Sequence, residues 1–598
     1  MTLNASDRTN QPIYLADLDS CLPSTALTRK SKRFHWTMLD FETDATQGTL
    51  LFAGEETQAP ELTYPLKTEG WHDIHIGLFN TAWRPYEAQR LWAKLDDDPA
   101  FSLIHLPPPS DLPWGVPPDD QVKGPRIQDV FWKTADLTGH TILFHQPCLR
   151  VLEEPGALGN PCSKVWIAYL KLVPLNKPEV QELLADRSRS ENKRLFAYND
   201  SWVTGDRGGI MPEGKSNAAS MKAYLEPYRH SDFSRIYWDG AHGDMCNYLT
   251  KIGRMWIPEH VQADDPPRLY DRLTLVAWDE YVKKGIDPFQ IAADFSHEIG
   301  LEFHACYRLG WRPFYWPPPF EDFNLGGFYD QHPELRCLAR DGRDSLGLSF
   351  AFDETQQFVL SLISEMASYP IDGVCMLYNR QPPFMEYEAP LVKGFQSEYG
   401  EDPRELDETD ARWLAYRSQF LTRFMKRLRR DLDDLASKQQ RSQPYPVSAW
   451  VFGSEEENLF YGLDVRGWVE QGLVDTLVPY TSAEKLFSFE LAWEKPEDVE
   501  YWLSLTRGTQ CEVAFNVMPR NMDAGQYRRK ADSLYQLGVE HLAFWDTAIT
   551  GGRASEALRR LGHREEIADW VAAREPAEER PSSPLRRLEQ WDLDYFPE

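Results

Sequence analysis

Residues 348–380 have the sequence LSFAFDETQQFVLSLISEMASYPIDGVCMLYNR, and this stretch decides the fold. Asp353 is a favourable N-cap residue, and Gln356 three positions later completes the spacing of a capping box. Apolar residues then recur at the i, i+3, i+4 and i+7 positions of one helix face: Val359, Leu362, Ile363 and Met366. The pattern predicts an amphipathic helix that buries one side.

A buried strand is predicted directly after this helix. Pro370 ends the helix, and residues 371–377 (IDGVCML) form a short apolar run between turn residues. Such a run is typical of a strand that is buried on both faces of a parallel sheet. Polar residues stand at the end of the strand, namely Tyr378, Asn379 and Arg380. Helix, turn, buried strand and polar cluster together make one unit of an α/β barrel.

The same unit recurs from about residue 194 onward. Eight strands are predicted at residues 195–200, 234–239, 301–308, 372–377, 447–453, 474–480, 511–518 and 540–545. Helices are predicted between them, for example over residues 287–300, 464–472 and 525–538, each ending near a glycine. Strands that alternate with helices in this way predict an α/β fold, a parallel (β/α)8 TIM barrel, over residues 190–575.

Three sequence blocks in this half resemble the glycoside-hydrolase-like family 10 group of TIM-barrel proteins. They are FAFDETQQFVLSLISEMASYPIDGV (350–374), EYGEDP followed by YRSQFLTRFMKRLR (398–403 and 416–429), and GLDVRGWVEQGLVDTLVPY (462–480). The resemblance spans roughly residues 194–550 and implies a barrel that acts on a carbohydrate. One departure is clear: relatives usually carry acidic residues on the strand after the DG pair, where this sequence has Cys375 and Leu377.

The first part of the chain has a different pattern. Residues 34–175 contain runs of alternating apolar and polar residues, such as HDIHIGLF and KVWIAYLK, separated by turn residues. Alternation with period two predicts an antiparallel β-sandwich, either a carbohydrate-binding-like module or a purely structural one. Residues 1–33 are predicted to be an N-terminal tail. Residues 576–598 are predicted to be an acidic C-terminal tail, poorly ordered or draped over the surface.

The composition argues against several classes of binding partner and cofactor. The 598-residue chain has a formal net charge of −29, which disfavours nucleic acid and anionic membrane surfaces. No signal peptide or transmembrane segment is found, and the 8 cysteines lack CxxC spacing, so we expect a reduced cytoplasmic protein. No convincing nucleotide or serine-hydrolase motif occurs, and no cofactor is expected. The sequence leaves the oligomeric state open.

Two aspartates are the best candidates for catalytic groups. In a TIM barrel the active site lies at the C-terminal ends of the strands. Asp239 and Asp546 each follow a tryptophan at such an end, in YWDG and FWDT. Glycosidic cleavage requires two carboxyl groups across the scissile bond, one protonated and one ionised. Their strands flank the first strand of the barrel, so this pair is predicted to be catalytic; the alternative is that each aspartate caps the next loop.

Other residues at the strand ends are predicted to bind the carbohydrate. They are Asp200, Trp238, Asp244, Arg308, Asn379, Arg380, Glu386, Tyr480, Asn516, Arg520 and Trp545. His242, Asp244 and Asp239 are too few ligands for a metal-dependent amidohydrolase, because the first strand lacks an HxH pair. No metal site is therefore predicted.

The arginines suggest a substrate charge. Arg308, Arg380 and Arg520 follow three different strands in a strongly acidic protein, which favours an acidic glycan with uronate or sulfate groups. The alternative is that these arginines pair with the acidic residues named above. The leading function is thus a glycoside hydrolase. A non-catalytic glycan-binding barrel and a uronate-specific polysaccharide lyase are the rivals, and the absent acids at Cys375 and Leu377 favour the first rival.

Overall fold

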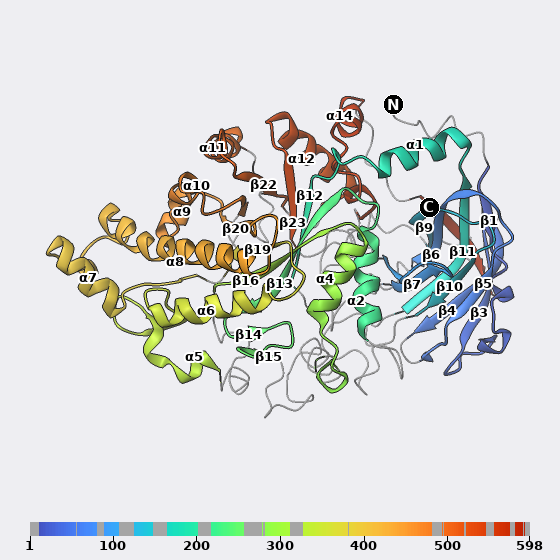
Figure 1. The fold of residues 1–598 in the computed structure, drawn as a ribbon. Helices are drawn as coiled ribbons and strands as arrows, with labels where there is room; N and C mark the ends of the chain where they lie inside the picture. The colour runs from blue at the N-terminus through green and yellow to red at the C-terminus, as the bar shows by residue number, and fades with distance from the viewer. Residues whose placement is uncertain are drawn as a thin grey trace.

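The structure of the protein is a computed structural model. It describes residues 11–54, 57–80, 89–106, 125–146, 164–200, 217–255, 278, 281–310, 327–380, 382–480, 493, 495–518, 522–545, 555–573, 581–589 and 591–592. An N-terminal domain of β-strands lies beside a large α/β barrel (Figure 1).

The barrel is closed by eight parallel strands. They are β12 (Leu195–Asn199), β13 (Phe233–His242), β16 (Glu302–Arg308), β19 (Gly373–Leu377), β20 (Val447–Phe452), β21 (Thr476–Tyr480), β22 (Glu512–Asn516) and β23 (His541–Trp545). Each pairs with the next in chain order, and β12 pairs with both β13 and β23, so the ring is complete. All eight predicted strands and the TIM-barrel fold are confirmed.

Helices cover the outside of this ring. The barrel helices are α2 (Asn217–Leu225), α4 (Pro288–Glu298), α6 (Asp353–Met366), α8 (Ala411–Lys438), α10 (Val465–Glu470), α11 (Pro496–Thr506), α12 (Ala524–Gln536) and α14 (Arg564–Ala572). Shorter or additional helices are α1 (Lys177–Arg187), α5 (Phe328–Gln331), α7 (Ala389–Tyr399), α9 (Glu455–Phe460) and α13 (Ser555–Leu558). The loops contain four short strands: β14 (Met245–Cys246), β15 (Arg254–Met255), β17 (Arg336–Leu338) and β18 (Asp344–Leu348).

The start of helix α6 differs from the prediction in one detail. The N-cap residue is Phe352, so Asp353 is the first helical residue and makes no side-chain cap. Gln356 turns back instead, and its Nε2 donates a hydrogen bond of 2.7 Å to the carbonyl of Phe350. The predicted capping box is therefore wrong, while the buried face with Val359 and Met366 is as predicted.

The N-terminal domain is built from thirteen hydrogen-bonded strands. They are β1 (Ile13–Leu15), β2 (Leu27–Thr28), β3 (Trp36–Thr43), β4 (Gln47–Gly54), β5 (Leu62–Pro65), β6 (Trp71–Asn80), β7 (Gln89–Leu95), β8 (Ser102–Leu106), β9 (Arg126–Asp136), β10 (Thr141–His145), β11 (Lys164–Pro174), β24 (Ser582–Leu588) and β25 (Trp591–Asp592). Most pairs are antiparallel, as predicted, and one connected network replaces two separate sheets of a sandwich. Strands β3, β4, β11, β6, β9 and β24 pair in a closed order around an apolar cluster to which all six contribute: Phe41, Leu50, Tyr169, Phe79, Ile127 and Leu585.

Both predicted tails contribute strands to this network. Strand β1 pairs with β11, and β2 pairs with β3, so residues 13–28 are part of the domain. Strand β24 lies between β3 and β9, with Leu585 buried, and appears as the red strand among blue ones in Figure 1. The predictions of a tail over residues 1–33 and of a draped tail over residues 576–598 are wrong for these strands. Strands β1 and β2 are held by their pairing with β11 and β3, and β24 is held by pairing on both sides and by the burial of Leu585.

The N-terminal end of the barrel is closed by an ionic network. Arg235 of β13 bonds to Glu302 at 2.8 Å and to Glu512 at 2.9 Å, and its guanidinium lies over the Phe196 ring. Thr476 accepts a further hydrogen bond from Arg235. Hydrogen bonds to His304 and His541, together with the Arg235 cation, lower the pKa values of Glu302 and Glu512 to about 2.

We expect Arg235→Met to lower the free energy of unfolding by about 2 kcal/mol, because methionine leaves two carboxylates of the network without their cation. Urea unfolding followed by circular dichroism would measure the change. Arg423→Met is the matched control, since Arg423 is exposed and contacts only the Phe420 ring among the described residues. That control should shift the free energy by less than about 0.5 kcal/mol, and equal losses in both variants would contradict the prediction.

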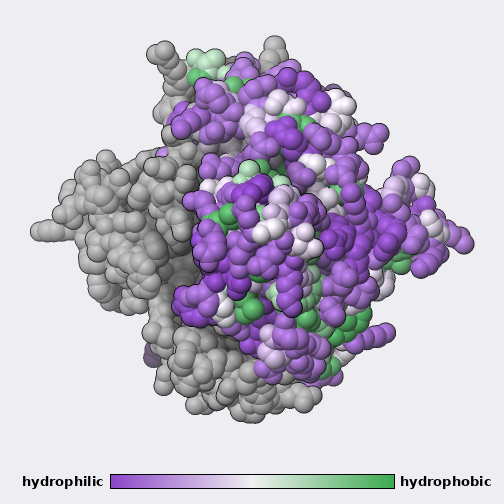
Figure 2. Space-filling view, turned by 90° about the vertical axis from the view of Figure 1, so that its left-hand side faces the viewer, coloured by the Kyte–Doolittle hydropathy of each residue, from purple (hydrophilic) through white to green (hydrophobic). Residues whose placement is uncertain are grey.

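No helix within the described ranges has both the length and the apolar character needed to cross a bilayer. The barrel face shown in Figure 2 is mostly hydrophilic, and its hydrophobic residues form small separate groups among the coloured atoms.

Candidate active site

Inward-pointing side chains of the eight strands fill the barrel. They form a barrel-interior cluster of Phe196, Tyr198, Tyr237, Cys306, Cys375, Leu377, Trp450, Val478, Tyr480, Ala514, Ala543 and Trp545. Alternate residues of the same strands belong instead to the core between the barrel and its helices. The inward positions at the C-terminal strand ends are therefore the ones that can form an active site, and we call this region the barrel mouth.

Two aspartates and one arginine meet at the barrel mouth. Arg308, at the end of β16, lies with its Nη2 2.5 Å from Asp200 Oδ1 and 3.1 Å from Asp239 Oδ2. The same nitrogen donates a hydrogen bond of 2.8 Å to the hydroxyl of Tyr198. Arg308 and Asp239 are each only 3% exposed at their side chains, and Asp200 is 16% exposed. The guanidinium thus holds two carboxylates from neighbouring strands close together.

The two aspartates have different surroundings. Burial raises the pKa of Asp239 to about 7; the Arg308 guanidinium opposes this shift and the Asp200 carboxylate adds to it. Asp239 Oδ1 is buried and has no hydrogen-bond partner among the described residues. Asp239 can consequently carry a proton near neutral pH, as a general acid must.

Aromatic rings and a second arginine flank this group. Trp545 stacks on Tyr198 with ring centroids 3.9 Å apart, and Tyr480 lies 5.3 Å from Trp545. The guanidinium of Arg380 lies 5.1 Å from the Trp545 ring centroid, and that of Arg308 lies 5.8 Å from it. Four predicted site residues (Arg308, Arg380, Tyr480 and Trp545) are therefore brought together.

Two buried amides also face this region. Asn379 follows Leu377 of the interior cluster by two positions, is 1% exposed, and has neither amide atom hydrogen-bonded within the described part of the chain. Asn516 is 0% exposed, and its Nδ2 donates a hydrogen bond of 3.3 Å to the carbonyl of Ala543. Its Oδ1 has no hydrogen-bond partner among the described residues. Buried polar atoms are normally hydrogen-bonded, so these amides are good candidates for ligand contacts.

Three predicted binding residues are placed elsewhere. Trp238 packs in the core between barrel and helices, 5.9 Å from the Phe303 ring, because it alternates with the inward-pointing Asp239. Asp244 lies beyond the strand and its Oδ1 accepts from Arg254 at 2.9 Å, which makes it a structural ion pair. Glu386 accepts a hydrogen bond from Ser345 of β18, away from the interior cluster. The assignment of these three to the carbohydrate site is not supported.

Two predicted site residues lie outside the described residues. They are Asp546, the predicted catalytic partner of Asp239, and Arg520. So do segments that follow strands at the mouth: 201–216, 311–326, 381, 481–492, 519–521 and 546–554.

The fourth strand lacks acids at the barrel mouth. Cys375 and Leu377 both belong to the barrel-interior cluster, where relatives of the resembled family would place carboxylates. In the strand register, Cys375 is opposite Cys306 and Leu377 is opposite Arg308. Among the described residues, Asp200 and Asp239 are the carboxyl groups that other strands bring to Arg308 at the barrel mouth.

Tyr198 and Trp450 were missed by the sequence reasoning. Tyr198 lies on β12 and precedes Asp200 by two residues, so the alternation of side chains along a strand places both on the inward side. Trp450 lies 5.4 Å from Trp545 and 5.5 Å from Tyr198, in the middle of the interior cluster. Strict counting of alternate positions from the predicted strand ends could have found both.

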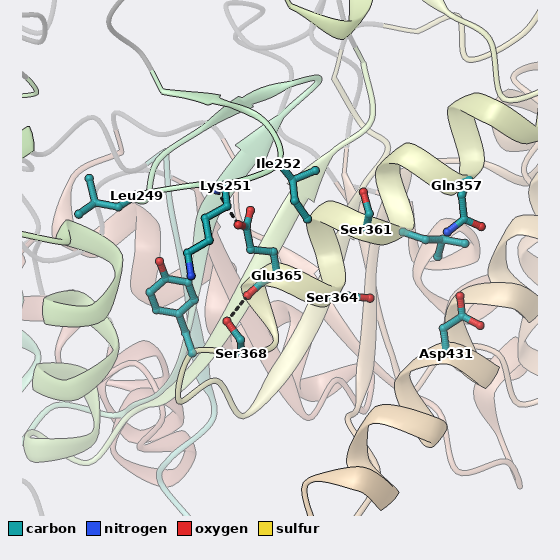
Figure 3. Close-up of a pocket in the computed structure, with 11 residues that line it drawn as sticks. Leu249, Lys251, Ile252, Gln357, Ser361, Ser364, Glu365, Ser368 and Asp431 are labelled. Atoms are coloured by element: carbon teal, nitrogen blue, oxygen red, sulfur yellow. Dashed lines mark hydrogen bonds between the residues drawn. The ribbon is translucent and has the colours of Figure 1, made fainter.

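Other hollows and polar clusters lie away from the barrel mouth. A surface hollow of about 550 Å³ lies along the outer side of α6, where the main chain of Lys251 donates to Glu365 (Figure 3). Asp96, Asp97 and His140 form an exposed group in the N-terminal domain whose side chains are close enough to hold a cation. Exposed acidic groups of this kind are common without an ion, so no function is assigned to it.

Comparison with known proteins shows a family match over part of the chain. Residues 268–501 match the family described as Glycosyl hydrolase-like 10. No curated protein sequence matches the chain. One similar solved structure is the PgaB (BpsB) glycoside hydrolase domain from Bordetella bronchiseptica, with 12% identity, a TM-score of 0.42, and coverage of 62% of this chain and 98% of that chain.

Two further solved structures are similar to this chain. Alpha-L-fucosidase isoenzyme 2 from Paenibacillus thiaminolyticus has 13% identity and a TM-score of 0.39, and the match covers 64% of this chain and 50% of that chain. Beta-galactosidase from the psychrophilic Marinomonas ef1 has 12% identity and a TM-score of 0.40, with coverage of 64% and 60%. The resemblance to glycosyl hydrolase-like family 10 indicated by the sequence motifs is confirmed over residues 268–501.

Proposed function

We propose that this protein is a glycosidase whose active site is the barrel mouth and whose general acid is Asp239. One observation carries the proposal: two carboxyl groups on neighbouring strands share Arg308, and only Asp239 is deeply buried with a raised pKa of about 7. A pair of carboxyl groups whose environments differ in this way suits acid and base roles in glycosidic cleavage. The family match over residues 268–501 supports a carbohydrate substrate.

In the proposed reaction, protonated Asp239 donates its proton to the glycosidic oxygen as the bond to the leaving sugar breaks. Asp200, which lies beside Arg308, stabilises the positive charge that develops on the sugar ring. A water molecule then adds to the anomeric carbon, and the proton that this water loses returns to the Asp239 carboxylate. Asp546, which lies outside the described residues, stays the alternative second carboxylate. The aromatic faces of Trp545 and Tyr480 provide apolar surface for a sugar ring.

Substrate recognition is assigned to the polar groups beside this pair. The buried amides of Asn379 and Asn516 have unused donor and acceptor capacity that sugar hydroxyl groups can satisfy. An acidic glycan has weaker support, because Arg308 already contacts Asp200 and Asp239. Arg380, beside the Trp545 ring, is the described arginine that could contact a uronate or sulfate group, for a hydrolase or for the lyase alternative.

The pH dependence of turnover tests the proposal. The general acid works only in its protonated form, so turnover should fall as pH rises through about 7, the pKa of Asp239. We expect an alkaline limb near pH 7 in the turnover of a glycan found by screening neutral and acidic oligosaccharides against the full-length protein. A turnover that stays constant from pH 6 to pH 9 would exclude Asp239 as the acid.

A non-catalytic glycan-binding barrel is the second candidate. The specific observation in its favour is that Cys375 and Leu377 line the interior where carboxylates would otherwise stand. Binding of glycans from the same panel, measured by calorimetry, without cleavage of any of them would favour this function over hydrolysis.

A further inference from the structure

Three segments that are distant in the sequence meet at the N-terminal end of the barrel. Helix α1 connects the N-terminal domain to the first barrel strand, and Asp186 lies in its last turn. Asp232 directly precedes strand β13. His563 is the N-cap residue of α14, which lies between α12 and α1 in Figure 1. The side chains of Asp186, Asp232 and His563 contact one another, and we call this group the histidine clamp.

Both ring nitrogens of His563 contact carboxyl groups. Nδ1 lies 2.7 Å from Asp232 Oδ2, and Nε2 lies 2.8 Å from Asp186 Oδ1. The side chains are largely buried, with exposed fractions of 10% for His563, 7% for Asp232 and 16% for Asp186. Each contact is short enough to require a hydrogen between nitrogen and oxygen, because two facing lone pairs repel each other.

The histidine clamp therefore holds an extra proton. A neutral imidazole carries one ring proton and an ionised carboxylate carries none, whereas two hydrogen bonds need two protons. In water these side chains lose the second proton above about pH 6.5. Although burial opposes the charged ring, hydrogen bonds to Asp232 and Asp186 raise the pKa of His563. Burial also raises the pKa of Asp232, so in either position the proton belongs to the clamp.

Other donors favour the ionised form of the two carboxyl groups. Asp186 also accepts from Arg560 at 3.0 Å and from the amide of Asn192 at 3.3 Å. Asp232 also accepts from the main chain of Gly562 at 2.8 Å. The proton is thus best placed on the imidazole, and His563 is the cation that contacts Asp232 among the described residues. Loss of the proton would leave this buried carboxylate without a cation in contact.

The remaining charged and titratable groups around the clamp are engaged with other partners or exposed. They are Arg560 with Glu566, Arg194 and Arg564 with Glu540, Arg559 at the carbonyl of Trp132, Lys193 at the carbonyl of Ser231, Tyr535 of α12 at the carbonyl of Leu561, and the exposed Arg189, Glu191 and Glu565. The pairing of the two aspartates therefore depends on His563 itself.

The segment that carries His563 is attached to both domains. Gly562 approaches the linker after α1 so closely that a Cβ atom there would lie 2.0 Å from the carbonyl oxygen of Asn192. On the other side, Glu556 of α13 accepts a hydrogen bond of 3.2 Å from the main chain of Phe131 in strand β9. Arg559 donates 3.0 Å to the carbonyl of Trp132 in the same strand. A change at His563 can consequently affect how the linker helix and the N-terminal domain are held.

We propose that the histidine clamp is a proton-dependent lock that fixes helix α1 and the α13–α14 segment to the barrel and loosens when its extra proton is lost. The folded-state pKa of His563 is raised above the value of about 6.5 in an unfolded chain. The stabilisation is therefore complete below about pH 6.5 and is lost as the pH rises through the folded-state pKa. The clamp lies at the opposite strand ends from Asp239, so it is independent of the proposed glycosidase activity.

Nuclear magnetic resonance of the full-length protein with ¹³C-labelled histidine measures this proton directly. The signal of His563 is the one that is absent from His563→Gln. Its midpoint should lie above about 6.5 in the parent. In Asp186→Asn the midpoint should fall, because the asparagine amide can donate to a neutral ring and removes the need for the extra proton.

Thermal unfolding between pH 5.5 and pH 9 tests the effect on stability. His563→Gln should melt about 2–4 °C below the parent at pH 5.5, and the gap should narrow as the pH rises through the measured midpoint. His297→Gln is the matched control, since His297 also contacts a carboxylate, Asp372 at 2.8 Å, but is 38% exposed. Its gap to the parent should stay below about 1 °C at every pH.

Asp186→Asn supplies the same stability test if His563→Gln does not fold, because its gap to the parent should narrow over the same pH range. Three results would overturn the proposal. They are a His563 midpoint at or below about 6.5, a gap in melting temperature that does not change with pH, and a gap of equal size and pH dependence in His297→Gln.

Discussion

A chain that ends at Arg580 is expected to lose the cooperative folding of its N-terminal domain. Strand β24 pairs on one side with β3, where Leu585 is opposite Thr43, and on the other with β9, where Ser583 is opposite Ile127. Removing it exposes two inner strand edges and the buried Leu585 site. The burial of one leucine contributes about 1.5–3 kcal/mol, and each of several ladder hydrogen bonds contributes about 0.5–1.5 kcal/mol. The truncation should therefore lower the free energy of unfolding of this domain by at least about 5 kcal/mol.

The measurement is the first unfolding transition in a calorimetric scan, together with light scattering, because unpaired edges promote aggregation. A chain that ends at Glu589 is the matched control, since it retains β24 and the hydrogen bond of 2.7 Å from Asp40 N to Glu589. A synthetic peptide of residues 581–592, added to the shorter chain, should restore the transition by strand addition. An unchanged first transition in the chain that ends at Arg580 would contradict the importance of β24.

The barrel could be predicted because its signals are local. Each strand is a short apolar run, and helix ends are marked by residues such as Asp287, whose side chain caps α4, and Gly300, whose φ is 86°. Parallel strands joined by helices have few closed arrangements, so recognising eight units was enough to give the fold.

Strand β24 could not be predicted for the opposite reason. Its sequence, SSPLRRL, has no regular alternation and includes a proline. Its pairing depends on β3 and β9, which are more than four hundred residues earlier in the chain. Long-range pairing of this kind has no local signature.

The site was predicted in part. The structure brings Asp200, Asp239 and Arg308 together at the strand ends, because the fold fixes where those ends meet, while their roles stay predictions. The sequence could not distinguish a free Arg308 from one paired with two aspartates, since that depends on distances below about 4 Å. Trp238 was an avoidable error, because a residue adjacent to an inward-pointing side chain on a strand must point outward.

Replacing Asp239 by asparagine is expected to lower turnover by about 10²–10⁴-fold, the usual contribution of a general acid. Asparagine keeps the size of the side chain and can still accept from Arg308, but it has no acidic proton to give to the leaving sugar. Glycan affinity should change little, because the binding contacts assigned to Asn379, Asn516 and Trp545 are retained. The alkaline limb of the pH profile near pH 7 should also disappear.

A matched control separates catalysis from stability. Asp129→Asn makes the same substitution at another buried aspartate that contacts a cation and a tyrosine, Lys171 at 2.7 Å and Tyr169 at 2.7 Å, but in the N-terminal domain. It should lower the melting temperature while leaving turnover within about twofold. If both variants lose stability and neither loses turnover, Asp239 is a structural partner of Arg308.

The second carboxylate is identified by the same assay applied to Asp200→Asn and Asp546→Asn. The partner of Asp239 should show a turnover loss of similar size, whereas the other aspartate should mainly affect affinity or stability. Asp200→Asn has an additional expected effect: without the neighbouring negative charge, the pKa of Asp239 falls, and the alkaline limb moves to lower pH. An alkaline limb that stays in place in Asp200→Asn would show that the two carboxyl groups do not interact, and the proposed pairing through Arg308 would then be wrong.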